Sequence, residues 1–414
     1  MKKIVKNLVL IMTIAIMFVF VGCSKENKKE EANETRGDFK EIAENAKGTT
    51  VNFYGWGGDE HTNRWIDTIL SKYVKENYDI TLKRVPMDID QILNKMIGEK
   101  QAGNKEGAVD LVWINGENFY TAMESKLLYG PITQYIPNYE KYLDGTSDEA
   151  KYDFGYEIKG HEVPYGKAQF VLINDSNITK ETPKNTAELL EFVKKYKGKV
   201  TYAAPPDFTG SAFVRNIIYE TVGYDKVKDL SGDKEEVRKA IKPAMDYLNE
   251  LKPYLWNEGK TYPASTSQVE NMFADGELVM TMSYNPNSVA TMIESGRFTD
   301  TSRSFIFDKG TIGNTHFVAI PENASNIDGA LAVINAIISP EMQSSKYDPK
   351  NWGDLPVVDF DKLNTEEKNL FNSVNAGKGV IPSDELLEKR VPEVPAKLVP
   401  VIEAIWQEEV AARG

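Results

Sequence analysis

The fold is decided by the stretch VNFYGWGGDE, residues 51–60. Its first half is rich in β-branched and aromatic residues, which is typical of a strand, and its second half is the loop GWGG followed by two acidic residues. Apolar pairs then follow at 65–66, 69–70 and 73–74, one helical turn apart. The stretch therefore predicts a strand, a glycine-rich loop and a helix, the repeating unit of a parallel sheet.

The same alternation of strand and helix continues along the chain. ITLKRV (80–85) and VDLVWI (109–114) predict two more strands, each followed by a helical pattern. The later predicted strands are KAQFVLI (167–173), VTYAAPP (200–206), LVMTMSY (278–284) and HFVAIP (316–321). Between them, Asn185 with Glu188 predicts a capped helix through Tyr196, and a second helix is predicted from Ser211 to about Thr221. We therefore expect an α/β fold with a largely parallel sheet that carries helices on both faces.

Length and charge limit the class of protein. The chain has 414 residues, 41% of them hydrophobic, which is enough for two or three domains or lobes with packed cores. The formal net charge is −13 at pH 7, and the sequence has no basic stripe that could meet a phosphate backbone. We therefore expect no nucleic-acid partner.

The N-terminus has the pattern of an export signal. Three lysines precede an apolar run over 8–21, and small and apolar residues then lead to Cys23 and a polar stretch. This looks like a bacterial lipoprotein signal. We predict a signal peptide over 1–22, then an acylated Cys23 and a flexible tether over 23–45, which place the body on the outer face of the cytoplasmic membrane. The alternative is an uncleaved anchor helix with an incidental cysteine.

Catalytic patterns are lacking in the sequence. Cys23 is the only cysteine, so neither an intramolecular disulfide nor a cysteine-based zinc site is available. The three histidines form no H-E-x-x-H arrangement, and the chain has no G-x-S-x-G, P-loop or dinucleotide fingerprint. Asp88 and Asp90 could serve as a carboxylate pair, but Asp88 is better explained as a helix N-cap. We expect a protein that is not an enzyme and has no cofactor or bound metal.

The loops at the ends of the predicted strands are rich in Gly, Asn, Ser, Tyr and Trp. They read GWGGDE, NGEN, PDFTGS, YNPN and, before a strand, GTIGNTH. Ligands of open α/β sheets lie beyond the carboxyl ends of the strands. The predicted ligand-binding residues are Trp56, Gly57, Gly58, Asn115, Glu117, Ser211, Tyr284 and Asn285.

Several of these residues have a structural alternative. Trp56 could be a stacking platform or could fold under the next helix, and Ser211 could contact a ligand or cap a helix. Trp113 could face the cleft or the core, and His316 is more simply explained as a satisfied imidazole. Asp59 and Glu60 lie where a helix begins and would repel an anion, which favours a neutral or cationic solute.

Five features together carry a family resemblance. They are the lipoprotein signal, YGWGG after the first strand, DLVWINGENF after the third, FVLINDSNI, and HFVAIP followed by a helix and SPEMQ. Over about residues 48–410 the chain resembles the extracellular solute-binding proteins of bacterial ABC importers, and among them the YnjB-type group related to thiamine and polyamine binders.

The resemblance implies a two-lobed periplasmic-binding-protein fold, type II-like, in which hinge strands join the lobes. Each lobe would be a mostly parallel sheet flanked by helices, and the ligand cleft would lie between the lobes. Lobe 1 would hold residues 46–167 and 308–345, and lobe 2 would hold 168–307 and 346–414. A monomer would close on one small polar solute, neutral or cationic, and deliver it to an ABC permease and its ATPase. The rival hypotheses are a surface carbohydrate-active enzyme, in which Glu117→Gln would abolish turnover, and an adhesin.

Overall fold

The computed structural model describes residues 36–412, apart from the side chain of Asp384, and the chain from Gly37 onward forms one compact unit. The predicted signal peptide and Cys23 lie outside the described residues. Within residues 36–412, no helix is long and apolar enough to cross a membrane.

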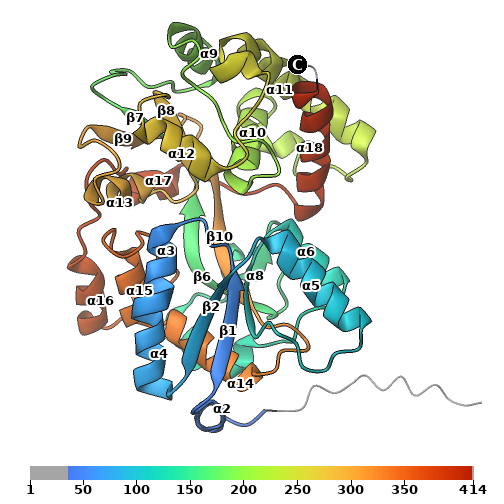
Figure 1. Ribbon diagram of the computed structural model, residues 1–414, viewed down its shortest axis with the longest axis vertical. Helices are drawn as coiled ribbons and strands as arrows, with labels where there is room; N and C mark the ends of the chain where they lie inside the picture. Colours follow the sequence, from blue (N-terminus) through green and yellow to red (C-terminus); the bar gives the residue numbers. More distant parts are fainter. Residues whose placement is uncertain (1–35, 413–414) are drawn as a thin grey trace, which may run out of the picture. The chain divides into compact units, whose positions relative to one another are not determined.

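The first lobe is built on a mixed sheet in the strand order β11-β10-β3-β1-β2, and β6 also pairs with β10 (Figure 1). β1 pairs in parallel with β2 and β3, whereas β10 runs antiparallel to β3 and β6. The strands are β1 (Thr50–Gly55), β2 (Thr81–Pro86), β3 (Leu111–Ile114), β6 (Glu162–Gln169), β10 (Thr311–Ala319) and β11 (Arg390–Val391). The strand, loop and helix predicted from residues 51–60 are confirmed.

Helices cover both faces of this sheet because its strands are apolar on both sides. Val51 and Phe53 belong to one buried cluster, and Tyr54 belongs to the other, so the alternation of the β1 side chains separates two cores. The helical elements of this lobe are α2 (Phe39–Asn45), α3 (Glu60–Arg64), the π-helical η1 (Trp65–Leu70), α4 (Ser71–Tyr78), α5 (Ile89–Gln101), α6 (Glu117–Glu124), η2 (Thr133–Tyr135), α7 (Pro137–Tyr142), α8 (Asp148–Lys151), α14 (Ile327–Ile337), α15 (Pro340–Tyr347), η6 (Phe360–Lys362) and α16 (Thr365–Asn372). A small hairpin, β4 (Tyr152–Asp153) and β5 (Tyr156–Glu157), completes it.

The second lobe has a three-stranded sheet in the order β8-β7-β9, and every pairing in it is antiparallel. The strands are β7 (Val171–Asp175), β8 (Met280–Ser283) and β9 (Ser302–Phe305). The helical elements are α9 (Thr186–Lys195), α10 (Phe208–Thr221), η3 (Tyr224–Lys226), α11 (Lys234–Leu251), η4 (Lys252–Tyr254), η5 (Trp256–Gly259), α12 (Thr266–Ala274), α13 (Ser288–Glu294), α17 (Ser383–Glu388), η7 (Ala396–Leu398), α18 (Val399–Trp406) and η8 (Gln407–Ala411). The expectation of a mostly parallel sheet in each lobe is therefore wrong for this lobe.

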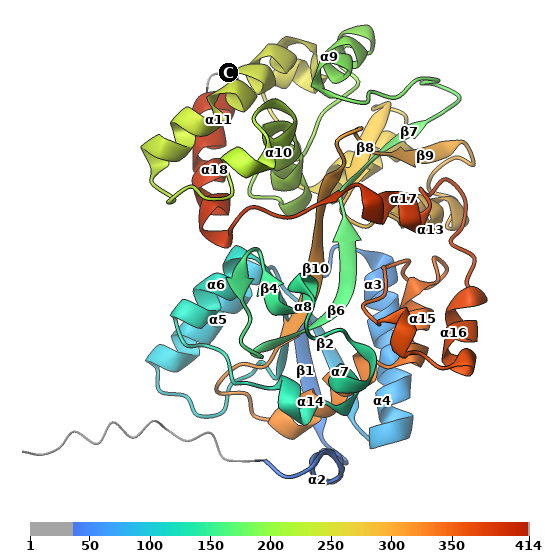
Figure 2. The ribbon, with the colours of Figure 1, turned by 180° about the vertical axis from the view of Figure 1, so that it is seen from behind.

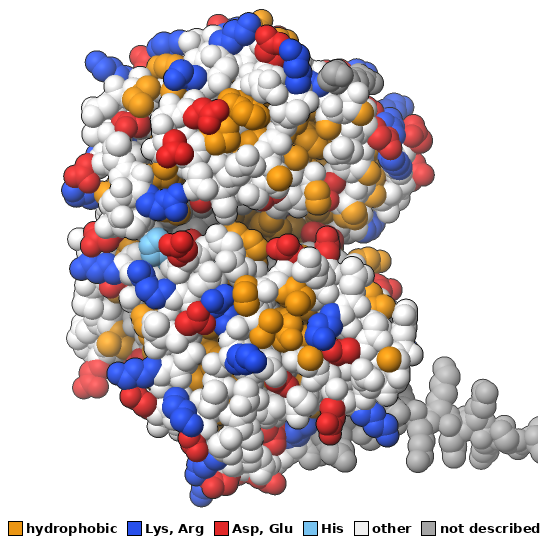
Figure 3. Space-filling view, viewed as in Figure 1, with side chains coloured by type: hydrophobic (Ala, Val, Ile, Leu, Met, Phe, Trp, Pro, Cys, Tyr) orange, Lys and Arg blue, Asp and Glu red, His pale blue; other side chains and the backbone are white. Residues whose placement is uncertain are grey.

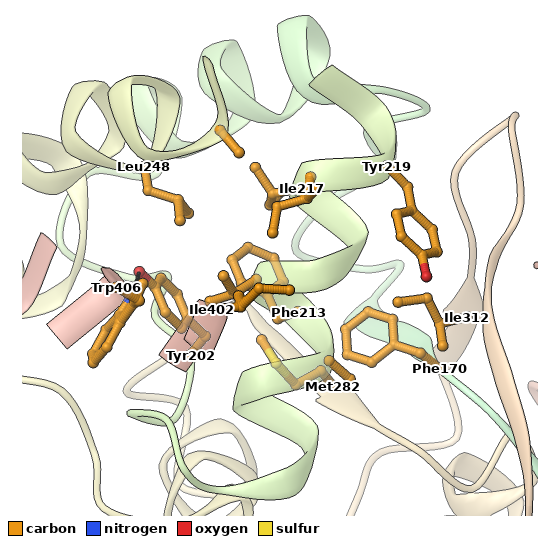
Figure 4. Packing of buried hydrophobic residues seen from close by; sticks show 14 of the residues in the cluster. Phe170, Tyr202, Phe213, Ile217, Tyr219, Leu248, Met282, Ile312, Ile402 and Trp406 are labelled. Carbon is orange, nitrogen blue, oxygen red and sulfur yellow. Dashed lines mark hydrogen bonds between the residues drawn. The ribbon is translucent and has the colours of Figure 1, made fainter. Parts of the chain in front are cut away.

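The predicted strand over 200–206 does not form. Pro205 and Pro206 have no N–H to donate to a sheet, and the segment instead runs unpaired across the buried core. Tyr202 lies in that core, where its hydroxyl accepts a hydrogen bond from Trp406 Nε1 at 3.1 Å. Figure 4 shows Tyr202 and Trp406 beside Phe213 of α10. The apolar residues that suggested a strand therefore serve the packing of α10 and α18.

Two long strands join the lobes. β6 and β10 run from the first lobe toward the second (Figure 2). Phe170, just after β6, and Ile312 of β10 belong to the core of the second lobe, whereas Val163 and Val318 belong to that of the first. The Phe170 N–H donates to the Ile312 carbonyl at 2.8 Å, so the two crossings support each other. We expect the hinge between the lobes to lie in these two strands.

Two segments pack differently from the sequence prediction. The tether predicted over 23–45 ends earlier, because Phe39–Asn45 forms α2 with Ile42 buried in the first core. The sequence predicts residues 346–414 in the second lobe, yet Leu363 and Phe371 pack in the first core. The chain packs in the second lobe only from Val380 onward, and even there β11 pairs with β10. The apolar residues in both segments are too few and too irregularly spaced to predict their packing.

Candidate functional site

The candidate site is the space between the two lobes. Figure 3 shows a hollow between them, in which hydrophobic side chains are exposed. From the first lobe, the loops after β1 and β3 reach this hollow. From the second lobe, the N-terminal ends of α10 and α12 and the loop after β8 do so. These loops carry most of the residues predicted from the sequence.

The loop after β1 presents an exposed tryptophan. The side chain of Trp56 is 46% exposed, and its ring lies over Gly58, where an added Cβ would come within 2.4 Å of the indole Cζ2. At Gly57 a Cβ would come within 2.4 Å of the Pro86 side chain. Glycine at both positions therefore lets the loop lie close to β2 with the indole outward. Of the two alternatives for Trp56, the exposed one is correct, and its contact with a ligand stays a prediction.

Asp59 ends this loop as an ionised helix cap. Its carboxylate accepts hydrogen bonds from the Thr62 N–H at 2.6 Å and the Thr62 hydroxyl at 2.7 Å, which cap α3. Burial acts to raise the pKa of Asp59, but the hydrogen bonds with His61 and Thr62 outweigh it and hold that pKa below its usual value. A negative charge therefore lies at this edge of the cleft.

α12 of the second lobe faces the same loop. The Ser267 hydroxyl donates a hydrogen bond to the Gly58 carbonyl at 3.4 Å. Glu270 lies three residues further along α12 and therefore on the same helix face, opposite Asp59. Burial, followed by the negative charge of Asp59, raises the pKa of Glu270 to about 8, although Arg297 opposes the shift. Two acids from opposite lobes thus face each other.

A second group of charges is built around Arg215 of α10. Arg215 is only 1% exposed and binds both carboxylate oxygens of Glu393 through one edge of its guanidinium, at 2.9 Å from Nε and 3.0 Å from Nη2. Its Nη1 donates to the Ser211 hydroxyl at 2.6 Å, and that hydroxyl donates to Glu403 at 2.6 Å. The Tyr284 hydroxyl donates to Glu393. We call Arg215, Glu393, Ser211, Glu403 and Tyr284 the Arg215 cluster.

The place of Ser211 differs from the sequence prediction. A helix beginning at Ser211 was predicted, but α10 begins at Phe208, and Asp207 is its N-cap, accepting from the Gly210 N–H at 2.8 Å. Ser211 therefore lies inside the helix, one turn before Arg215, and its hydroxyl links Arg215 to Glu403. The N-cap alternative is wrong for this residue.

Glu117 is a residue of the first lobe that faces the Arg215 cluster. It is the first residue of α6, after Gly116, whose φ of 65° starts the helix sharply. Its Oε2 is buried and has no hydrogen-bond partner among the described residues. Burial raises the pKa of Glu117 to about 7; the charge of Glu403 adds to this, while Arg215 opposes it. Glu117 is thus half-protonated near neutral pH.

Two more carboxyl groups lie behind Glu117 in the first lobe. Asp153 is buried and accepts a hydrogen bond from the Gly116 N–H at 2.5 Å. Glu162 is fully buried on β6, and neither of its carboxyl oxygens has a hydrogen-bond partner among the described residues. Burial raises the pKa of both groups well above the usual values, and each is affected further by a neighbouring acid.

The structure brings three predicted residues together and separates the others. Glu117, Ser211 and Tyr284 meet at the Arg215 cluster, and the tryptophan loop faces α12. Asn115 is half-buried after β3, and Asn285 accepts a hydrogen bond from the Asn287 N–H at 2.9 Å within the turn before α13. Their contact with a ligand stays a prediction.

Trp113 and His316 belong to an aromatic group at the base of the hinge. Their ring centroids lie 5.2 Å apart, and Trp113 also packs against Tyr165 and Trp352. His316 Nε2 lies 3.4 Å from the Asp354 carboxylate, which is also bound by the buried Lys346 at 2.5 Å. Trp113 therefore packs with other aromatic rings against the first core, which is the core alternative. The part of the chain that is described contains no group of three or more His, Cys, Asp or Glu residues placed to hold a metal.

Sequence reasoning missed the residues that carry most of the charge here. Arg215 lies in the apolar run SAFVRNII, and Glu393 and Glu403 lie in the C-terminal part, far from any predicted loop. One signal was available, because a charged residue inside an apolar helix is almost never buried without a partner. The spacing of Ser211 and Arg215, one helical turn apart, pointed to the same helix face.

Two α/β lobes joined by hinge strands, with charged and aromatic loops between them, define the class of two-lobed solute-binding proteins. Solved structures support the fold. AfuA of Actinobacillus pleuropneumoniae, described with exogenous fructose-6-phosphate bound, matches with a TM-score of 0.61 at 16% identity over 88% of this chain and 99% of that one. A putative spermidine/putrescine ABC transporter protein of Listeria monocytogenes matches with a TM-score of 0.60 at 16% identity, over 87% of this chain and 98% of that one.

Sequence comparison gives the family. Residues 68–359 match the model described as bacterial extracellular solute-binding protein, and the chain belongs to this family. Protein YnjB of Escherichia coli K12 is 38% identical over 338 residues, which are 81% of this chain and 86% of that protein. Membership implies a small-molecule ligand, an ABC permease as partner and a location outside the cytoplasm. Family members are binding proteins rather than enzymes.

Proposed function

We propose that this chain is the lipid-anchored substrate-binding subunit of an ABC importer and that it captures a small, polar, cationic solute between its lobes. The main observation in favour of a positively charged solute is the excess of acidic side chains where the lobes meet. Asp59 faces Glu270 at one place, and Glu117 adds an acid to the Arg215 cluster at the other.

The facing acids favour a positive ligand for a simple electrostatic reason. Closing the lobes brings like charges together and removes water from between them, which costs free energy. A cation placed between them replaces that repulsion with attraction to both lobes at once. The ligand would then stabilise the closed state selectively, which is the condition for closure on binding. The exposed indole of Trp56 adds a face on which a cation can stack.

The fold itself does not choose the charge of the solute. Of the two solved structures above, one is described with a sugar phosphate bound and the other as a putative polyamine transporter, and both match equally well. The side chains in the cleft must therefore carry the specificity, and in this chain their excess of acids favours cations.

The solute can be sought with the full chain purified in detergent. Mass spectrometry of compounds released on denaturation, followed by a thermal-shift panel of amines, thiamine, amino acids and sugars, would identify it. We expect only compounds with a positive charge to raise the melting temperature substantially, and we expect Glu117→Gln to reduce that rise. Glu191→Gln is the matched control, because Glu191 is exposed on α9. A substantial shift with an anionic sugar phosphate would contradict the proposal.

Lipid attachment is tested separately. Metabolic labelling with a palmitate analogue should mark the wild-type protein and leave Cys23→Ser unlabelled. Labelling of the Cys23→Ser variant would contradict attachment at this cysteine, and it would leave the proposal for the solute unaffected.

A further inference from the structure

A line of three carboxyl groups leads from the cleft into the first lobe. Glu117 lies at the cleft, and Asp153 accepts a hydrogen bond from Gly116, the residue before it. Glu162 lies deeper, with a fully buried side chain whose two oxygens have no hydrogen-bond partner among the described residues. An ionised carboxylate in such surroundings would lack both water and a counter-charge. The two inner groups are therefore held neutral.

The titratable groups that face Glu117 come from four elements. Arg215 comes from α10, Glu393 from the segment after β11, Glu403 from α18 and Asp153 from β4. Arg215 is the one cation among them. Its guanidinium binds Glu393 through Nε and Nη2 and Ser211 through Nη1, and it makes no hydrogen bond with Glu117. Glu117 Oε2 is buried and has no hydrogen-bond partner among the described residues.

We propose that a cationic solute binds at Glu117 by exchange with a proton, so that closure of the lobes on the solute releases that proton to the solvent. This rests on the proposed function, because it takes the solute to be cationic. The carboxyl O–H bond of Glu117 breaks, the proton passes to water or buffer, and the carboxylate pairs with the incoming cation. No other bond changes.

The sign of the pH dependence follows from this exchange. A cation beside Glu117 favours the ionised form and lowers the pKa of that carboxyl in the complex. Below about pH 7 the empty protein carries the proton and must lose it on binding. The affinity for a permanently charged cation should therefore rise by up to tenfold per pH unit as the pH increases toward 7, and should level off above it.

The exchange can be measured by isothermal titration calorimetry at pH 6.5 in two buffers with different ionisation enthalpies. The probes are tetramethylammonium, 1,4-diaminobutane and thiamine. For any probe that binds, we expect wild type to release between half a proton and one proton, and Glu117→Gln to release none. Glu191→Gln, on the exposed surface of α9, should release as much as wild type.

The empty protein gives a second test that needs no ligand. Carbon-detected nuclear magnetic resonance should show one glutamate carboxyl with a midpoint near pH 7 that is missing in Glu117→Gln. If no probe binds, the absence of such a midpoint overturns the proton exchange. A cation that binds without proton release overturns the exchange but leaves the proposed function standing. Binding of an anion only would overturn both.

Discussion

Acidic side chains from the two lobes meet at two places, and only one of these places has a buried cation that balances the negative charge. In the Arg215 cluster, a buried guanidinium binds both carboxylate oxygens of Glu393. Where Asp59 faces Glu270, neither carboxylate forms an ion pair with lysine or arginine in the described part of the chain, and both side chains are partly exposed.

The difference follows from burial. A fully buried carboxyl group stays ionised only beside a permanent counter-charge, because it has no water to stabilise its charge. A partly exposed pair of acids can remain solvated while the lobes are apart. Its electrostatic repulsion therefore costs free energy only when the lobes close. We infer that the Arg215 cluster is needed for the folding of the second lobe, whereas the Asp59–Glu270 pair responds to closure and to pH.

The largest effect is expected from removal of the buried cation. Arg215→Met should lower the free energy of unfolding by about 3–5 kcal/mol, because it leaves Glu393 buried without a counter-charge. Urea denaturation measures this loss. Arg303→Met is the control, since Arg303 is exposed and donates only to backbone carbonyls. A loss below about 1 kcal/mol for Arg215→Met would show that the pair is not needed for folding.

At the exposed edge of the cleft, a substitution should affect solute binding and leave stability nearly unchanged. Trp56→Ala should weaken solute binding by about 1–2 kcal/mol through loss of a stacking face, with little change in melting temperature, because the indole is half-exposed. Calorimetry and thermal unfolding measure the two effects. Unchanged affinity would remove Trp56 from the site, and a large fall in melting temperature would show that it supports the fold instead.

The facing acids predict a pH effect of moderate size. The pKa of Glu270 is raised from its ordinary value of 4.5 to about 8, so the folded protein keeps a proton that the unfolded chain has lost. Its contribution to stability is therefore fully present below about pH 4.5 and is lost as the pH rises toward 8. Glu270→Gln should flatten this fall and melt higher than wild type at pH 8.5.

Melting temperatures of wild type, Glu270→Gln and the control Glu294→Gln across pH 4.5–9 would measure the effect. Glu294 lies at the exposed end of α13 and should leave the wild-type curve unchanged. Parallel curves for wild type and Glu270→Gln would show that Asp59 and Glu270 do not interact across the cleft.

The smallest effect is expected at the hydrogen bond between the lobes. Ser267→Ala removes the 3.4 Å contact with the Gly58 carbonyl, which is long for a hydrogen bond and partly open to water. We expect less than a threefold loss of affinity by calorimetry. A tenfold loss would show that this contact, rather than the charges, holds the lobes together.

The sequence predicted best those features that depend on neighbouring residues. The strand, loop and helix at residues 51–60 formed as expected, and so did the cap of α9, where Asn185 accepts from the Glu188 N–H at 3.0 Å. The exposed face of Trp56 also agrees with the prediction. Each of these depends on periodicity, glycine or a capping residue, and such signals are local.

The features that failed depend on contacts between distant residues. The segment over 200–206 looked like a strand because it is apolar, but its prolines left it unpaired in the core. The Arg215 cluster joins α10 to residues 178 and 192 positions later, and no local pattern indicates such a pairing. The sequence therefore predicted Glu117 and Tyr284 as site residues without predicting the arginine around which they gather.

The central claim is that the acids between the lobes select a positively charged solute. It is tested most directly by the affinity of whichever panel compound binds, measured by calorimetry with wild type, Glu117→Gln and Glu191→Gln. The account predicts that this compound carries a positive charge and that Glu117→Gln binds it about 10- to 100-fold more weakly, with Glu191→Gln unchanged. An anionic compound, or equal affinity for wild type and Glu117→Gln, would contradict it.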